Sequence, residues 1–210
     1  MGLFKKLAAQ GRKPSGRLGR FIGKKMNSSH AKIRRWGLSS ISIKPDSCVL
    51  DVGCGGGMAV KEIASSISNG KVYGIDYSED MVQLSKKVND DLIKHGIVEI
   101  IEGSVSALPF QDNTFDFVTA FESYYFWPDM VSDLIEIKRV LKPRAFLLLV
   151  HAAYKDEKFE KRNNKVARLL DIKFHTPDEY KDFLAEGGYK IEKIDCLPEK
   201  NWIAIVAQKA

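Results

Sequence analysis

The fold is decided by the stretch Val49-Leu50-Asp51-Val52-Gly53-Cys54-Gly55-Gly56-Gly57. A short apolar run that ends in glycines is typical of a buried strand. Glycines at such a point let the backbone turn sharply and approach a ligand closely, with the N–H groups of the next helix nearby. The stretch therefore predicts a strand, a tight turn and a helix, with a ligand site at the turn.

Two known glycine-rich motifs do not fit this turn. The nicotinamide fingerprint would place its third glycine at position 58, where the chain has Met58. A P-loop would need Gly-Lys followed by Ser or Thr, and none follows. Asp76, at the end of the second predicted strand, lies 23 residues after Gly53. That spacing suits a carboxylate that accepts both hydroxyls of an adenosine ribose.

Strands and helices alternate along the rest of the chain. Apolar runs predict strands at 47–52, 71–75, 97–101, 115–121, 145–150, 189–196 and 202–208. Helical spacing and stop signals predict helices at 60–67, 79–95, 130–141 and 176–184, the third closed by Pro143. Strands separated by helices indicate a parallel, doubly wound sheet, so the fold class is α/β. The short link between the last two strands predicts that the last one is antiparallel.

Length and composition fit one ordinary globular domain of 210 residues, with 44% apolar and 29% charged residues. Residues 1–45 hold 12 of the 33 Lys and Arg and no Asp or Glu, whereas the rest holds 21 basic and 27 acidic residues. We therefore expect a basic N-terminal arm over 1–45, with short amphipathic helices at 18–36. The main domain would cover 46–210, with a charged helical insertion near 155–170. The arm could bind nucleic acid or an anionic membrane surface, or could dock on the acidic domain.

The cysteines and the apolar runs bear on location. Cys48, Cys54 and Cys196 form no C-x-x-C pair and have no histidines at metal-ligand spacing, so we expect reduced thiols and no metal site. The apolar run 145–150 is too short to span a bilayer. The N-terminus is charged and lacks the apolar core of a secretory signal. These features predict a cytoplasmic protein.

Five segments, in order over residues 46–150, resemble the class I methyltransferases that depend on S-adenosylmethionine (SAM). They are DVGCGGG at 51–57, GIDYS at 74–78, EGS at 102–104 with ALPF at 107–110, FDFV at 115–118 and EIKRVLKP at 136–143. The chain is most similar in character to the branch that includes quinone-biosynthesis and related small-molecule methyltransferases. The resemblance implies a Rossmann-like three-layer sandwich whose seven strands are ordered 3-2-1-4-5-7-6, the seventh antiparallel.

The resemblance also implies SAM as the cofactor, with S-adenosylhomocysteine as its product, and assigns residues to it. Asp51 would orient the glycine loop and the methionine amino group, and Asp76 would hold the ribose. The other implied contacts are Gly53, Cys54 and Gly55 at the methionine part, Tyr77 and Met81 beside the adenine, Gly103 and Ser104 at the adenine edge, and Phe121 beside the sulfonium. The position of Ser104 is commonly aspartate, so serine weakens the expected contact with the adenine amino group.

Methyl transfer from SAM is an in-line displacement that a protein mainly positions and desolvates. A base is needed only if the acceptor must lose a proton. Because ligands lie at the carboxyl ends of the strands, Glu122 and His151 are candidates, and His30 could belong to a lid over SAM. Glu122 could equally hold a loop or a ligand in place, and both histidines could be structural. Aromatic residues next to Glu122 could wall a substrate pocket or fill the core: Tyr124, Tyr125, Phe126 and Trp127.

The leading hypothesis is an enzyme that methylates a small molecule at O, N or C. A nucleic-acid methyltransferase is the first alternative, suggested by the basic arm. Against it, the chain has no Asn/Asp-Pro-Pro-Tyr/Phe segment and no Pro-Cys nucleophile. A second alternative is a non-catalytic SAM-binding protein that uses its arm on anionic surfaces. The sequence specifies neither the acceptor nor the oligomeric state.

Overall fold

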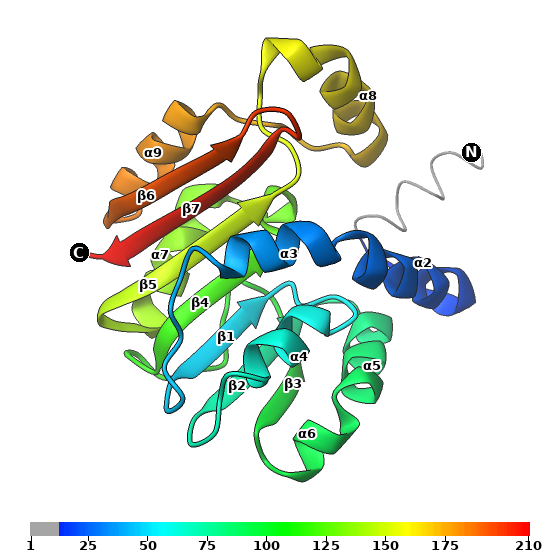
Figure 1. Cartoon of the computed structure of the whole chain (residues 1–210), viewed down its shortest axis with the longest axis vertical. Coiled ribbons are helices and arrows are strands. Elements are labelled where there is room, and N and C mark those ends of the chain that lie inside the picture. Colours follow the sequence, from blue (N-terminus) through cyan, green and yellow to red (C-terminus); the bar gives the residue numbers. More distant parts are fainter. Residues whose placement is uncertain (1–12) are drawn as a thin grey trace.

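The computed structural model describes residues 13–210, so the first part of the predicted basic arm lies outside the described residues. A seven-stranded sheet in the order β3-β2-β1-β4-β5-β7-β6 forms the centre of the protein (Figure 1). Its strands are β1 (Cys48–Val52), β2 (Lys71–Asp76), β3 (Val98–Glu102), β4 (Phe115–Phe121), β5 (Leu141–His151), β6 (Tyr189–Leu197) and β7 (Trp202–Lys209). Neighbours pair in parallel except at β7, which is antiparallel to β5 and β6. The predicted fold class and strand order are confirmed.

Helices cover both faces of this sheet. The helices α3 (Ala31–Leu38), α4 (Met58–Ala64) and α5 (Glu79–Val88) pack on one face, and α7 (Met130–Val140) and α9 (Pro177–Glu186) pack on the other. Side chains of a strand alternate between faces. Accordingly Leu147 and Leu149 of β5 join the core under α7 and α9, whereas Leu148 and Val150 join the core under α3. Burial on both faces explains why residues 145–150 of β5 are an uninterrupted apolar run.

Three predicted helix boundaries are wrong. The helix predicted over 79–95 is two helices, α5 and α6 (Asp90–Lys94), separated at Asn89. The Asn89 side-chain amide donates to the carbonyl oxygens of Ser85 and Gly57, which ties this break to the glycine turn. The helix predicted to reach Ile67 ends at Ala64. Pro143 ends no helix, because α7 stops at Val140 and β5 begins at the next residue.

The described part of the arm forms α2 (Gly16–Ser29) and α3, and both helices dock on the main domain. The backbone N–H of Gly16 and the Arg20 guanidinium donate to the Asp80 carboxylate, at the start of α5. The buried Arg34 of α3 forms a bidentate pair with Glu62 of α4, with N···O distances of 2.8 and 2.7 Å. These charge-assisted hydrogen bonds fix the arm helices over the glycine turn.

The charged insertion predicted near 155–170 is a short 3-10 turn, η2 (Glu157–Phe159), followed by α8 (Glu160–Leu170). It follows the carboxyl end of β5, and α8 stands at that edge of the sheet (Figure 1). The helix predicted after Thr176 is α9, and its capping box between Thr176 and Glu179 is complete. No described helix is both long and apolar enough to cross a membrane.

Candidate active site

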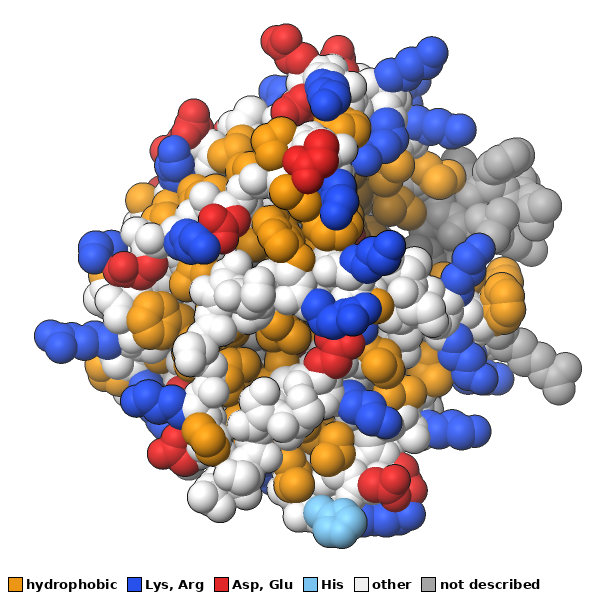
Figure 2. All heavy atoms as spheres, in the orientation of Figure 1, with side chains coloured by type: hydrophobic (Ala, Val, Ile, Leu, Met, Phe, Trp, Pro, Cys, Tyr) orange, Lys and Arg blue, Asp and Glu red, His pale blue; other side chains and the backbone are white. Residues whose placement is uncertain are grey.

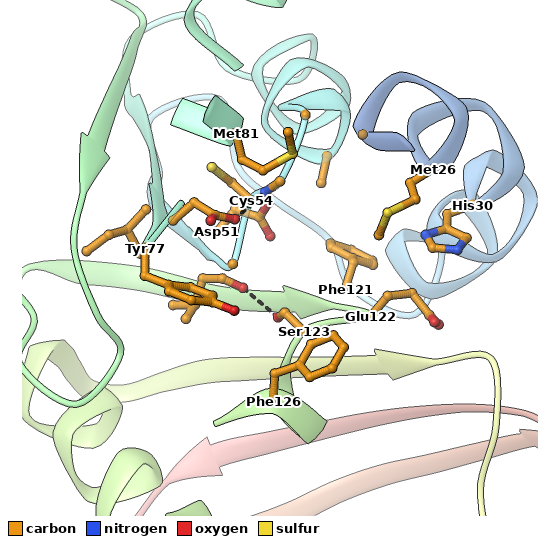
Figure 3. Close-up of a pocket in the computed structure, with 18 of the residues that line it drawn as sticks. Met26, His30, Asp51, Cys54, Tyr77, Met81, Phe121, Glu122, Ser123 and Phe126 are labelled. Carbon is orange, nitrogen blue, oxygen red and sulfur yellow. Dashed lines mark hydrogen bonds between the residues drawn. The ribbon is translucent and has the colours of Figure 1, made fainter. Parts of the chain in front are cut away.

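A cavity of about 340 Å³ opens at the carboxyl ends of β1, β2 and β4. All ten residues that the sequence assigns to the cofactor line it: Asp51, Gly53, Cys54, Gly55, Asp76, Tyr77, Met81, Gly103, Ser104 and Phe121. Figure 3 shows two ends of this cavity. The glycine-loop end carries Asp51, Cys54, Tyr77 and Met81 with the buried Asp76, and the helix end carries Met26, His30, Phe121, Glu122 and Phe126.

The backbone of the glycine loop, residues 53–57, is held on every side. The N–H groups of Gly53 and Cys54 donate to the carbonyl of Ile75, over 2.8 and 3.0 Å. The Asn27 side chain of α2 donates to the carbonyl of Gly56 over 3.0 Å. Gly53 has a φ of 71°, and a Cβ there would lie 2.4 Å from the Cβ of Ser123. The turn therefore needs glycine at position 53, both for its left-handed φ and for the close approach of Ser123, which follows β4.

Asp76 combines burial with spare hydrogen-bonding capacity. One carboxylate oxygen accepts from the N–H of Gly55 over 2.8 Å, and the other accepts from the N–H of Ser78 over 2.9 Å. Burial raises the pKa of Asp76, and these two hydrogen bonds act in the opposite direction. An ionised carboxyl group offers about four lone-pair positions. Each Asp76 oxygen can therefore still accept a hydroxyl proton from a ligand in the cavity.

Asp51 is a buried carboxyl group on the cavity wall. Burial raises its pKa to about 7, opposed by the hydrogen bond from Thr119 and by the charge of Arg34. The Thr119 hydroxyl donates to Oδ1 of Asp51 over 2.7 Å. A buried carboxylate is costly unless a cation pairs with it closely. The cavity is thus suited to a ligand that brings a positive charge to Asp51.

Glu122 is the charged group of the helix end. It follows β4 with a φ of 55°, which is uncommon for a residue other than glycine. Its carboxylate accepts from the N–H of Ala152, and Nδ1 of His151 lies 3.3 Å from Oε1. Burial alone would raise the pKa of Glu122, but His151, His30 and the Ala152 hydrogen bond together hold it below its usual value. Glu122 is therefore an ionised carboxylate at neutral pH.

Some of the other predicted residues line the cavity, and others do not. His30 and Trp127 line the cavity, whereas His151, Tyr124 and Tyr125 do not. His151 is 3% exposed and stacks on Tyr125, with ring centroids 4.2 Å apart. Its Nε2 has no hydrogen-bond partner in the described part of the chain. Tyr124 is fully buried in the core under α7 and α9.

Several lining residues escaped the sequence assignment. Met26 and Asn27 lie on the inner face of α2, where helical spacing predicts a shared face but not its partner. Of the aromatic run that the sequence singled out as a pocket wall or core filling, Phe126 and Trp127 line the cavity. Within residues 13–210, no group of three or more His, Cys, Asp or Glu side chains could hold a metal ion.

The sheet order and a cavity that combines a glycine loop with a strand-end carboxylate define the class I SAM-dependent methyltransferase fold. Comparison with known proteins agrees, since residues 50–149 match the methyltransferase domain family. Demethylmenaquinone methyltransferase of Bacillus mycoides (strain KBAB4) is 38% identical over 116 residues, which are 54% of this chain and 48% of that protein. The chain thus spans about half the length of the curated relatives it matches. Over residues 50–149 the chain is thus similar to methyltransferases of the class I SAM-dependent type, including one of quinone biosynthesis.

Two solved structures share this fold over the whole chain. One is the methyltransferase of Haloferax volcanii in complex with the Trm112 methyltransferase activator, with a TM-score of 0.80 and 20% identity, covering 100% of this chain and 98% of that chain. The other is a geranyl diphosphate methyltransferase in complex with GPP and sinefungin, with a TM-score of 0.78 and 13% identity, covering 100% and 99%. At these identities both structures support the fold alone.

The residues at the glycine-loop end fit SAM by their own chemistry. SAM carries an ammonium group, a sulfonium and a ribose with two adjacent hydroxyls. Asp51 is a buried carboxyl group in need of a cation, and Asp76 has free acceptor positions. A Cβ at Gly55 would meet no atom within 4 Å, so the loop borders open space there. The donor set and the space both match the cofactor of this fold.

Proposed function

We propose that this protein transfers a methyl group from SAM to a small-molecule acceptor that binds at the helix end of the cavity. The observation that carries the proposal is the single cavity shared by the two ends, with SAM-type residues at one and a carboxylate among apolar side chains at the other. SAM supplies the activated methyl group. The protein would supply alignment and exclusion of water, which are what an in-line displacement requires.

At the glycine-loop end, the expected roles of the residues follow from their surroundings. Asp51 would pair with the methionine ammonium, and Asp76 would accept from the ribose hydroxyls. Tyr77 and Met81 would flank the adenine, with Gly103 and Ser104 at its edge. Phe121, of the helix end, lies between Cys54 and Glu122 in Figure 3, which supports the expected place beside the sulfonium. The helices α2 and α3, which cover the site, support the expected division of the chain into an arm over 1–45 and a domain over 46–210.

At the helix end, apolar side chains predominate. Met26, Phe121, Phe126 and Trp127 line the cavity around Glu122 and His30. Such a wall favours an acceptor with an aromatic or aliphatic body and one polar group. Glu122 would orient that polar group and accept its proton where the reaction releases one. His30 lines the same end and would assist from the arm, while His151 would act only through Glu122, because it does not reach the cavity.

Calorimetric titration of SAM and S-adenosylhomocysteine tests the central proposal. We expect micromolar binding to the wild type and a loss of about 1–3 kcal/mol in Asp76→Ala, the scale of lost charge-assisted hydrogen bonds. Asp195→Ala, at a half-buried carboxylate of β6 remote from the cavity, is the matched control. Absence of binding to the wild type would reject the proposal. Binding that Asp76→Ala leaves unchanged would reject the role of this residue.

A further inference from the structure

The exposed hydrophobic side chains of this protein are unevenly distributed. In the described part of the chain, the large ones are Leu18, Phe21, Tyr77, Ile135 and Leu169. Scattered exposed hydrophobic residues are ordinary and need no explanation. Tyr77 lines the cavity, and three others lie on α2 and α8, the helices at the carboxyl-end edge of the sheet (Figure 1). Ile135, on α7, lies away from this edge.

α2 presents two faces of different chemistry. Its inner face, with Gly23, Met26 and Asn27 at helical spacing, lines the cavity. On the outer face, Leu18 is 49% and Phe21 is 66% exposed. Exposed Lys24 and Lys25 follow directly, and the helix contains no acidic residue. Figure 2 shows hydrophobic side chains among Lys and Arg side chains at the right edge, where Figure 1 places α2.

α8, far from α2 in sequence, repeats this combination. Leu169 is 44% exposed, and the exposed Lys165 and Arg168 lie four and one residues before it, so that Lys165 is its neighbour on the helix surface. The segment 161–170 holds four Lys and Arg and no Asp or Glu. Both helices thus present bulky apolar side chains framed by basic ones, at the edge where the cavity opens.

We propose that these outward faces form a membrane-docking surface that binds anionic lipid bilayers, made of Leu18, Phe21, Lys24, Lys25, Lys165 and Leu169. Apolar side chains set among Lys and Arg are the pattern by which amphipathic helices lie in a membrane interface. The basic residues meet the negative lipid headgroups, and the apolar ones enter the boundary of the acyl chains. Nucleic acid would use the basic residues but leave Leu18, Phe21 and Leu169 without a partner. A second copy of the same surface would be repelled by like charge.

The proposed surface concerns binding of the protein to a membrane and goes beyond the proposed methyl transfer. Its test needs no turnover, so it can fail or succeed independently of the proposed methyl transfer. Docking through α2 would bring the cavity, which the inner face of the same helix lines, to the bilayer surface. An acceptor dissolved in the membrane could then enter without crossing water.

Co-sedimentation of the full chain with vesicles tests the proposal. Vesicles of phosphatidylcholine alone are compared with vesicles that contain about 30% phosphatidylglycerol, at about 0.1 M and about 0.5 M salt. We expect binding to the anionic vesicles at low salt and roughly tenfold weaker binding at high salt, because the electrostatic part is screened. Binding to neutral vesicles is expected to be weaker by at least about tenfold.

Variants separate the apolar part from the basic part. We expect Leu18→Ser/Phe21→Ser and Lys24→Glu/Lys25→Glu each to bind anionic vesicles at least about tenfold more weakly. Leu169→Ser should weaken binding about threefold, because α8 contributes one apolar side chain to the surface; unchanged binding would remove α8 from the surface. The matched controls are Ile135→Ser on α7 and Lys86→Glu/Lys87→Glu on α5, which should bind like the wild type. Because all these side chains are exposed, circular dichroism should report an unchanged fold.

Three results would overturn the proposal. One is equal binding of neutral and anionic vesicles. Another is wild-type binding by Leu18→Ser/Phe21→Ser, since the apolar face would then play no part. The third is salt-sensitive binding of a short RNA together with no binding of vesicles, which would make this surface a nucleic-acid site.

Discussion

At the glycine-loop end of the cavity, the wall comes from the carboxyl ends of β1 and β2 and the segments that follow them. The glycine loop itself is held by hydrogen bonds to the Ile75 carbonyl of β2 and by the side-chain amides of Asn27 in α2 and Asn89 between α5 and α6. At the helix end, Met26 comes from α2, whereas Glu122 and Phe126 come from the segment that follows β4, far away in the sequence. The glycine-loop end is a backbone fixed by hydrogen bonds, and the carboxyl groups of Asp51 and Asp76 line the cavity there. The helix end is a set of side chains whose positions depend on tertiary packing.

This difference indicates that the two ends of the cavity have different roles. The glycine-loop end is the proposed site of the cofactor, so substitutions there should change the affinity for SAM. At the helix end the buried carboxylate of Glu122 lies 3.3 Å from Nδ1 of His151, and Nε2 of the same ring has no hydrogen-bond partner in the described part of the chain. Buried polar groups of this kind are maintained against their desolvation cost and often serve chemistry. Substitutions there should change turnover more than cofactor binding.

The largest effect is expected at Glu122. In Glu122→Gln, which keeps the size of the side chain but removes its charge, we expect turnover to fall about 100-fold or more, the scale of losing a positioned acid–base group. The SAM dissociation constant should stay within about twofold, because the charge-assisted contacts to the cofactor lie at the other end. Steady-state kinetics with an identified acceptor and calorimetry with SAM make the two measurements.

Glu186→Gln, at an exposed glutamate of α9, is the control for Glu122→Gln. Full turnover in Glu122→Gln would remove both the proton-accepting and the orienting role. A parallel loss of SAM affinity would show instead that the two ends of the cavity are not separable.

At the glycine-loop end, Asp51→Asn should weaken SAM binding by roughly 10- to 100-fold, because a buried charge-assisted contact is lost. The same change should stabilise the protein without ligand at pH 8 by about 2 kcal/mol, since it removes a buried charge. The sign follows from the raised pKa: the stability that Asp51 contributes in its neutral form is lost as pH rises through about 7. Thermal unfolding at pH 8 and pH 5 should therefore show a gain at pH 8 that shrinks at pH 5. A destabilised variant at pH 8 would contradict this account of Asp51.

The pH dependence of SAM affinity tests the same role of Asp51. Asp51 has a pKa of about 7 in the free protein, and only its ionised form pairs with the SAM ammonium. Lowering the pH from about 8 to about 6 should therefore weaken SAM binding roughly tenfold by proton linkage. Calorimetry in several buffers would show the accompanying proton release. Asp51→Asn should have a nearly flat profile, and a wild-type profile equally flat would exclude this linkage.

The glycine-loop end could be predicted from the sequence because its positions follow from strand topology. Parallel strands end at one edge, so Asp51 and Asp76 at two strand ends must meet there. The same reasoning places His151 at this edge of the sheet. It does not tell on which face of the sheet the side chain lies, because adjacent residues of a strand point to opposite faces. Val150 lines the cavity, whereas His151 is buried behind Glu122.

The sequence predicts a helix here and a lid with His30, but not that Met26 and Asn27 of α2 line the cavity, because that depends on long-range packing. Gly23 weakens a helix by its intrinsic preference, and the sequence alone makes it a reason to doubt α2. In the structure, a Cβ at Gly23 would lie 2.7 Å from Sδ of Met81. This glycine lets α2 lie close against α5 and brings Met26 and Asn27 to the cavity. The absence of a side chain at Gly23 thus disfavours the helix in isolation and yet allows α2 to pack closely against α5.

The smallest effect is therefore expected from Gly23→Ala. The added methyl group meets the flexible end of Met81, which can move, and alanine favours the helix by about 1 kcal/mol over glycine. Stability should change little, because these two contributions oppose each other. SAM affinity should weaken about two- to fivefold, since Met81 lines the cavity and is displaced. Ser28→Ala, on the exposed side of α2, isolates the helix preference and should leave SAM affinity unchanged. Wild-type affinity in Gly23→Ala would mean that the close seating of α2 does not contribute to the cofactor site.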